Sequence, residues 1–173
     1  VNLAWLSVSV WLVRRRAGLV ACAWYGITAL VLIGGYGLDG LSQPWNPWVS
    51  LLPFTVLLLA TWSVLEGDRW MPVLAVAAGS YALQGHIGYA PVVLPLVAVC
   101  LAAPIWRWWR CGDERPSATR WLLPAGAGFG LALLAWAGPL WDVLTNSPHN
   151  VSKLIANFSE PSEDPIGIGR GLE

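Results

Sequence analysis

Long uncharged apolar runs alternate along the chain with short segments that carry charges, prolines or glycines. An α-helix needs about 20 apolar residues to cross the roughly 30 Å hydrocarbon core of a bilayer. Several runs reach or approach that length, so the pattern predicts an all-α fold, a polytopic bundle of five to six transmembrane helices. The predicted spans are about 1–13, 17–37, 48–65, 70–83, 91–106 and 121–141.

The two ends of the chain differ from its middle. As a helix, the first run would extend only about 20 Å, and no Met precedes it. We therefore expect the chain to be a fragment that lacks its N-terminal part. We predict that residues 1–141 form the helical bundle. Residues 142–173 are expected to be an extracytoplasmic tail or the start of a further outer segment, with a short amphipathic helix near 151–158.

The segment between Arg69 and Arg107 contains 37 residues and no Asp, Glu, Lys or Arg. As one helix it would be about 55 Å long, which corresponds to two crossings. Gly85, Gly88 and Pro91 lie near its midpoint, and these residue types are typical of a tight reversal. We therefore predict a membrane hairpin whose tip is 84–89.

Composition supports the membrane class and excludes others. Hydrophobic residues make up 56% of the chain and charged residues 12%, a balance that cannot cover a water-soluble globule. The ten basic and ten acidic residues cancel, so no net field favours nucleic acid. The three cysteines have neither disulfide-framework nor metal-ligand spacing. The expected partner is the lipid bilayer, with many of the 13 tryptophans at its interfaces.

Basic residues predict the orientation, because short basic loops stay in the cytoplasm. One set of alternating loops contains eight arginines, whereas the other contains only Lys153 and Arg170. The first set is therefore expected to be cytoplasmic. Loops 37–47 and 84–90 and the tail 142–173 are then extracytoplasmic.

Polar side chains gather in these predicted outer segments. In loop 37–47, Trp45 and Asn46 lie between two prolines; the tryptophan would either anchor the loop at the interface or stack on a sugar face. In the hairpin tip, Gln84, His86 and Tyr89 place an amide, an imidazole and a phenol within six residues. They would bind a hydroxylated or phosphorylated ligand, or simply form a solvated loop.

The acidic residues nearest the outer surface are Asp39 and Asp142. Each would act as a general base or cation ligand, or be a solvated charge at a helix end. His86 and His149 lack the neighbours that a metal site requires, so no metal ligands are predicted. In the last span, small residues would let another helix approach closely. They are Gly126, Gly128, Gly130 and Ala132.

A series of short motifs extends along nearly the whole chain: PWNPW, LLPF, the Gly67-Asp68 turn, Gly79-Ser80, QGHIGY and Ser147-Pro148-His149-Asn150. In these motifs the chain resembles a group of actinobacterial polytopic membrane proteins that are similar to GT-C glycosyltransferases. The resemblance implies a GT-C-like bundle in the bacterial plasma membrane. It also implies a transferase that moves a sugar from a polyprenyl-phosphate donor to a cell-envelope glycan acceptor on the outer face.

The resemblance also implies residue roles. The catalytic Asp of such enzymes usually follows the first helix, so we expect it to lie outside this chain, with Asp39 and His86 as the candidates within it. Substrate-binding candidates are Trp45, Asn46, Gln84, His86, Tyr89 and Asn150. A divalent cation is compatible with the family. Two alternatives stay open: a non-catalytic integral membrane protein of envelope assembly, or a transporter, for which the ionisable residues expected within spans are missing from the sequence.

Overall fold

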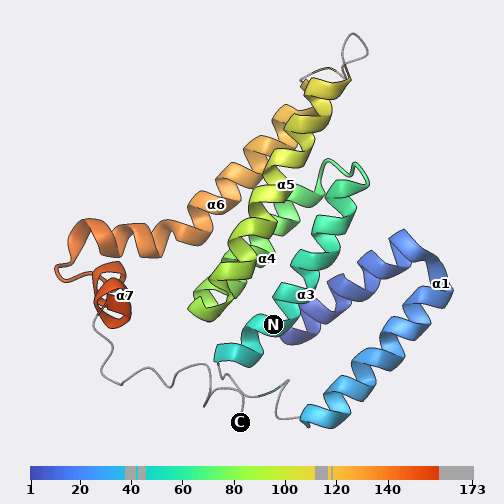
Figure 1. Cartoon of the computed structure of the whole chain (residues 1–173), viewed down its shortest axis with the longest axis horizontal. Coiled ribbons are helices and arrows are strands. Elements are labelled where there is room, and N and C mark those ends of the chain that lie inside the picture. The colour runs from blue at the N-terminus through green and yellow to red at the C-terminus, as the bar shows by residue number, and fades with distance from the viewer. Residues whose placement is uncertain (38–41, 43–45, 112–116, 118, 160–173) are drawn as a thin grey trace. The chain divides into compact units, whose positions relative to one another are not determined.

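The computed structural model describes residues 1–37, 42, 46–111, 117 and 119–159, and these residues are almost entirely helical. The helices are α1 (Asn2–Tyr36), α3 (Asn46–Leu65), α4 (Met71–Gly85), the 3-10 turn η1 (Ile87–Tyr89), α5 (Ala90–Arg110), α6 (Thr119–Thr145) and α7 (Asn150–Ser159) (Figure 1). No strand occurs in this described part, which confirms the all-α prediction.

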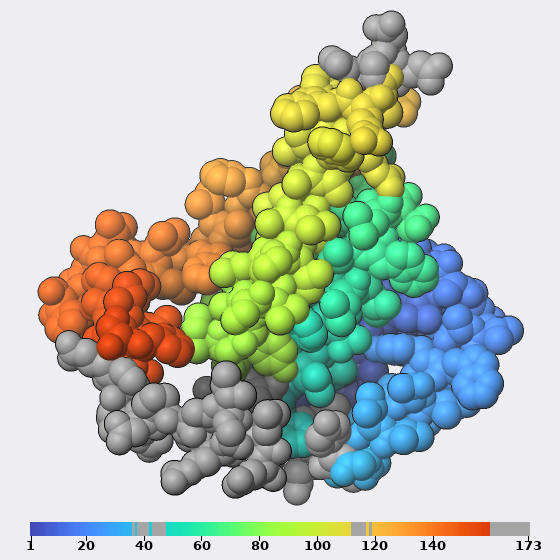
Figure 2. Space-filling model, viewed as in Figure 1, coloured from blue at the N-terminus to red at the C-terminus, as the bar shows by residue number. Residues whose placement is uncertain are grey.

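Four helical segments are long and apolar enough to cross a membrane: Asn2–Gly35, Trp48–Leu65, Ile87–Arg110 and Thr119–Thr145. Much of α5 lies uncovered in the space-filling view (Figure 2). Its apolar residues Val92, Leu94 and Leu101 are exposed. Apolar surface of this kind is stable in hydrocarbon and costly in water. The helices are therefore those of an integral membrane protein. The chain divides into two compact units, Val1–Ala135 and Trp136–Glu173.

Helix α1 is bent sharply into two arms (Figure 1). The bend lies at Gly18, whose φ of 83° is accessible to glycine at little steric cost. The hydroxyl of Tyr25 donates to Ser9 Oγ at 2.8 Å, although 16 residues of straight helix would separate the two by about 24 Å. The predicted spans 1–13 and 17–37 thus lie on two arms that fold back on each other.

Helix α3 is the centre of the first unit, where it packs against α1, α4 and α5. Its residues Val56, Leu57 and Ala60 are fully buried. Opposite them, α4 presents small residues, and a Cβ on Gly79 would lie 2.7 Å from Val97 Cγ2 of α5. Small residues let apolar helices approach closely, which is how helices gain packing energy within a membrane.

Helices α4 and α5 form a hairpin. The chain leaves α4 at His86, turns through η1 and enters α5, which has Pro91 in its first turn. Proline is tolerated there because the first N–H groups of a helix have no partner within the helix. The reversal therefore occurs within the segment 84–89 that the glycines and the proline indicated.

The second unit contains the end of α6 and the helix α7. Asp142 joins them: its Oδ2 accepts from the Asn150 backbone N–H at 2.7 Å, and its Oδ1 accepts from Asn146 Nδ2 at 2.9 Å. A carboxylate at a helix N-terminus is favourable because it faces unpaired N–H groups. Exposed apolar residues follow one stripe of α7, at Val151, Leu154, Ile155 and Phe158. The amphipathic helix expected near 151–158 is present.

Candidate functional site

Three charged segments meet at one end of the first unit: 14–16, 66–69 and 107–110. We call this end the arginine end. Its centre is Asp68, in the turn between α3 and α4. Asp68 Oδ2 lies 2.7 Å from Nη2 of both Arg15 and Arg16, and its Oδ1 accepts from the Trp70 N–H at 3.1 Å. The Asp68 side chain is only 8% exposed. One nearly buried carboxylate therefore joins the bend of α1 to the α3–α4 turn.

Two further contacts extend this end. Arg16 Nε donates to Ser63 Oγ at 3.0 Å, which anchors the arginine to α3 as well. The Arg107 guanidinium lies against Gly67, where a Cβ would collide with it, and Gly67 also has a positive φ of 95°. The C-terminal end of α5 is thus at the same end as the α3–α4 turn. Arginines that the sequence assigned to one membrane side are close in space.

The hairpin tip, residues 84–89, lies at the opposite ends of α4 and α5 and brings three of the predicted site residues together. His86 Nδ1 accepts from the Gly88 N–H at 3.0 Å, so the proton of the neutral imidazole is on Nε2. The ring is half-buried and lies edge-on to Tyr89, with centroids 6.2 Å apart. Tyr89 in turn packs against Phe54 of α3 at 5.3 Å. The imidazole is thereby held in one orientation.

Gly88 is required for this arrangement. A Cβ at this position would lie 2.6 Å from His86 Cε1, closer than such atoms approach in proteins. Any side chain at residue 88 would therefore push the imidazole away from the backbone N–H that it caps. The close approach of the His86 ring to the backbone N–H of residue 88 therefore requires glycine at that position.

Gln84 has a clear structural contact. Its Nε2 donates to the backbone carbonyl of Ala135 at 2.9 Å and so joins the end of α4 to α6. This bond occupies one of the two amide N–H groups. Ligand binding by Gln84 stays a prediction, next to the helix-joining role that the contact shows.

The other predicted site residues lie outside the described residues or in the second unit. Asp39 and Trp45 lie outside the described residues, as does the side chain of Asn46, whose backbone begins α3. Asn150 begins α7 in the second unit and uses its N–H to bind Asp142. Both carboxylate oxygens of Asp142 accept hydrogen bonds within that unit.

Metal ligands do not gather in the described part of the chain. No group of three His, Cys, Asp or Glu side chains there is arranged to hold an ion. Cys100, for example, is buried and lies 3.2 Å from Thr61 Oγ1, with which it shares a hydrogen bond. The described residues therefore contain no three-ligand cluster for a divalent cation.

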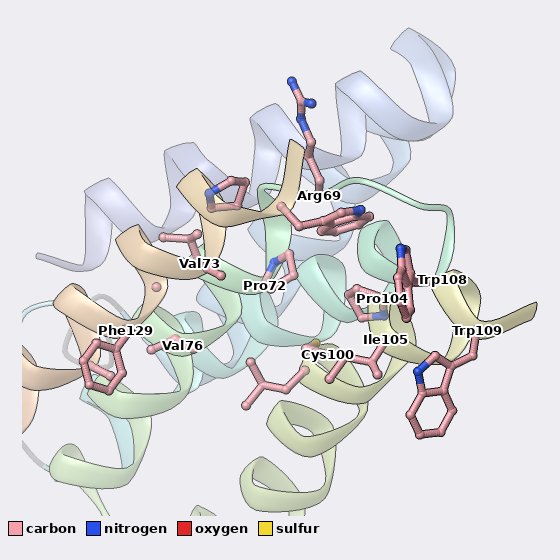
Figure 3. Close-up of a pocket in the computed structure, with 16 residues that line it drawn as sticks. Arg69, Pro72, Val73, Val76, Cys100, Pro104, Ile105, Trp108, Trp109 and Phe129 are labelled. Atoms are coloured by element: carbon pink, nitrogen blue, oxygen red, sulfur yellow. The ribbon is translucent and has the colours of Figure 1, made fainter. Parts of the chain in front are cut away.

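Sequence reasoning missed a pocket of about 560 Å³ between α4, α5 and α6 (Figure 3). The small residues of the last predicted span were the sequence feature that could have indicated this pocket. Only part of the expected helix packing is seen: a Cβ on Gly128 would lie 3.8 Å from Val73 Cγ2, whereas Gly126 and Gly130 face open space. Helix α6 approaches α4 at Gly128, and the pocket lies beside this contact.

Comparisons with known proteins found no counterpart: no family model, no curated protein and no solved structure matches this chain.

Proposed function

We propose that this chain is the membrane-embedded part of a GT-C-like transferase that moves a sugar from a polyprenyl-phosphate donor to a cell-envelope acceptor. The hairpin tip would line its substrate groove. The observation that carries the proposal is the fixed imidazole of His86, with Nδ1 bound to the Gly88 N–H and the Nε2 proton directed elsewhere. A donor held in place before substrate arrives suits the recognition of phosphate or sugar oxygens.

The proposed orientation follows from the arginine end. Short basic loops remain cytoplasmic, so the arginine end faces the cytoplasm and the tip faces outward across the bacterial plasma membrane. Loop 37–47, with Trp45 and Asn46, and the tail with Asn150 are then on the outer side too. We assign six helical segments to this topology, counting the two arms of α1 separately.

The residues of the tip have different proposed roles. His86 donates from Nε2 to a phosphate or hydroxyl oxygen, while its Nδ1 stays bound to the Gly88 N–H. Tyr89 supports the imidazole edge-on. The acid–base residue of the reaction is proposed to lie outside the tip, because segment 84–89 contains no Asp or Glu.

His86→Asn separates recognition from structure. Asparagine can accept from the N–H two residues ahead, as in an Asx turn, but has no counterpart of Nε2–H. We expect the variant to insert at the wild-type level. Incorporation of a labelled monosaccharide into envelope glycan should fall about tenfold, the effect of losing one hydrogen bond to a charged group. Wild-type incorporation in His86→Asn cells that lack another copy would remove His86 from the site.

The orientation has its own test. A cysteine placed at Asn46 in a cysteine-free background should react with a membrane-impermeant maleimide added to intact cells. Labelling only after lysis would invert the topology and place the tip in the cytoplasm.

One observation favours a second candidate, a non-catalytic protein of envelope assembly. The Gln84 bond to Ala135 uses a polar tip residue to hold helices together. In that case His86→Asn and Tyr89→Phe would both leave glycan incorporation unchanged, while Gln84→Ala would lower only the stability of the protein.

A further inference from the structure

The pocket between α4, α5 and α6 has the dimensions of a ligand site. Its volume of about 560 Å³ lies within the range of about 300–1,000 Å³ that is usual for small-molecule sites. Apolar side chains from three helices form its wall, among them Val76, Ile105 and Phe129 (Figure 3). A hydrocarbon chain is the natural occupant of such a surface.

The pocket opens on the outside of the first unit. Several of its lining side chains are exposed, including Leu101 at 51%, Ile105 at 56% and Phe129 at 68%. They lie on α5 and α6, which have the composition of membrane spans. A lipid can therefore enter the pocket sideways from the bilayer, without passing through water.

One end of the pocket is cationic and aromatic. Arg69 lines it through its aliphatic stem, and its guanidinium points away from the apolar side chains (Figure 3). No ion pair of Arg69 occurs among the described residues. Trp108 and Trp109 flank the same end, and indoles are typical of the headgroup level of a bilayer.

The surrounding charges favour an anion there. The three segments that define this end contain six arginines and two acidic residues, which leaves a net charge of +4. Asp68 is already paired with Arg15 and Arg16, so it does not neutralise Arg69. An apolar pocket whose headgroup end has a cation with no ion pair among the described residues matches an anionic amphiphile.

We propose that this pocket binds one anionic phospholipid from the leaflet at the arginine end, with an acyl chain between α5 and α6 and the phosphate at Arg69. Basic pockets between membrane helices on the cytoplasmic side commonly bind such headgroups. This site lies at the opposite end of α4 and α5 from His86 and does not depend on the transferase proposal.

Native mass spectrometry of the purified protein tests the proposal. Delipidated protein in mild detergent is titrated with dioleoyl phosphatidylglycerol and, separately, with dioleoyl phosphatidylcholine. We expect one phosphatidylglycerol to bind about tenfold more tightly than phosphatidylcholine. Arg69→Gln should abolish that preference, and Arg69→Lys should retain most of it. Ala125→Leu, which fills the pocket wall, should weaken the binding of both lipids.

Arg14→Gln is the matched control, since Arg14 is an exposed arginine of the same end that does not line the pocket. It should change phosphatidylglycerol affinity less than twofold. Equal affinity for the two lipids would overturn the proposal, as would equal losses in Arg69→Gln and Arg14→Gln. Tighter binding of decaprenyl phosphate than of phosphatidylglycerol would also overturn it, because the pocket would then be a polyprenyl site.

Discussion

Different kinds of interaction stabilise the arginine end and the hairpin tip. At the arginine end, one nearly buried carboxylate binds two guanidinium groups and closes the bend of α1 onto α3. At the tip, two neutral hydrogen bonds and a ring contact hold Gln84, His86 and Tyr89 in place. Charge compensation thus stabilises one end, while the other keeps a polar group oriented at little electrostatic cost.

Asp68→Asn should produce the largest effect. Loss of the carboxylate leaves two arginines without their partner, and breaking a mostly buried ion pair from one side typically costs about 3–5 kcal/mol. Because Arg15 is 45% exposed and can be solvated, we expect a loss of about 2–3 kcal/mol in unfolding free energy. Denaturation of the purified protein in detergent, followed by circular dichroism, measures it.

Glu66→Gln is the control for that measurement. Glu66 is an exposed acid in the same turn, and the described ion pairs do not include it. Its substitution should change stability by less than about 0.5 kcal/mol. Similar losses of unfolding free energy in Asp68→Asn and Glu66→Gln would show that stability depends on the net charge of the arginine end and not on the Asp68 ion pairs.

Gly88→Ala should have an intermediate effect, confined to the tip. The added methyl displaces the His86 ring and breaks its bond to the Gly88 N–H. We expect a loss of about 1 kcal/mol in stability together with a fall in glycan incorporation comparable to that of His86→Asn. Gly130→Ala, which adds a methyl where nothing lies within 4 Å, should alter neither quantity. Full incorporation in Gly88→Ala would show that the ring orientation is unimportant.

Gln84→Ala should have the smallest effect, about 0.5–1 kcal/mol, because the lost bond to Ala135 is exposed and neutral. Gln84→Glu should lose the same amount, since a carboxylate cannot donate to a carbonyl oxygen. The same denaturation assay compares them. If Gln84→Glu were as stable as wild type, side-chain packing rather than the hydrogen bond would hold α4 to α6.

Much of the helical organisation was predictable. Uncharged runs of spanning length identified α3 and α6, and Gly85, Gly88 and Pro91 located the reversal between α4 and α5. The tip residues were predicted as a group because they are close in sequence. The sequence predicted two spans, 1–13 and 17–37, divided at Arg14–Arg16. Helix α1 instead continues through these arginines and bends at Gly18, because glycine accepts the positive φ.

Other features could not be predicted, for physical reasons. Sequence assigned Arg15, Arg16 and Asp68 to one membrane side but not to one another, since any of several arginines could have paired with that acid. Tyr25 and Ser9 are brought together only by the angle of the α1 bend. Gln84 was read as a ligand-binding amide because its acceptor, Ala135, is 51 residues away in sequence.

By itself, the sequence determined that this protein is built of apolar helices, where those helices are interrupted and which ends carry the arginines. These properties depend on local composition and on the cost of placing charge in hydrocarbon. Only the tertiary structure decided that α3 is central, that α6 touches α4 closely at Gly128 and that a pocket opens beside it. A surface facing lipid and a surface facing another helix are equally apolar, so hydrophobic pattern does not distinguish them.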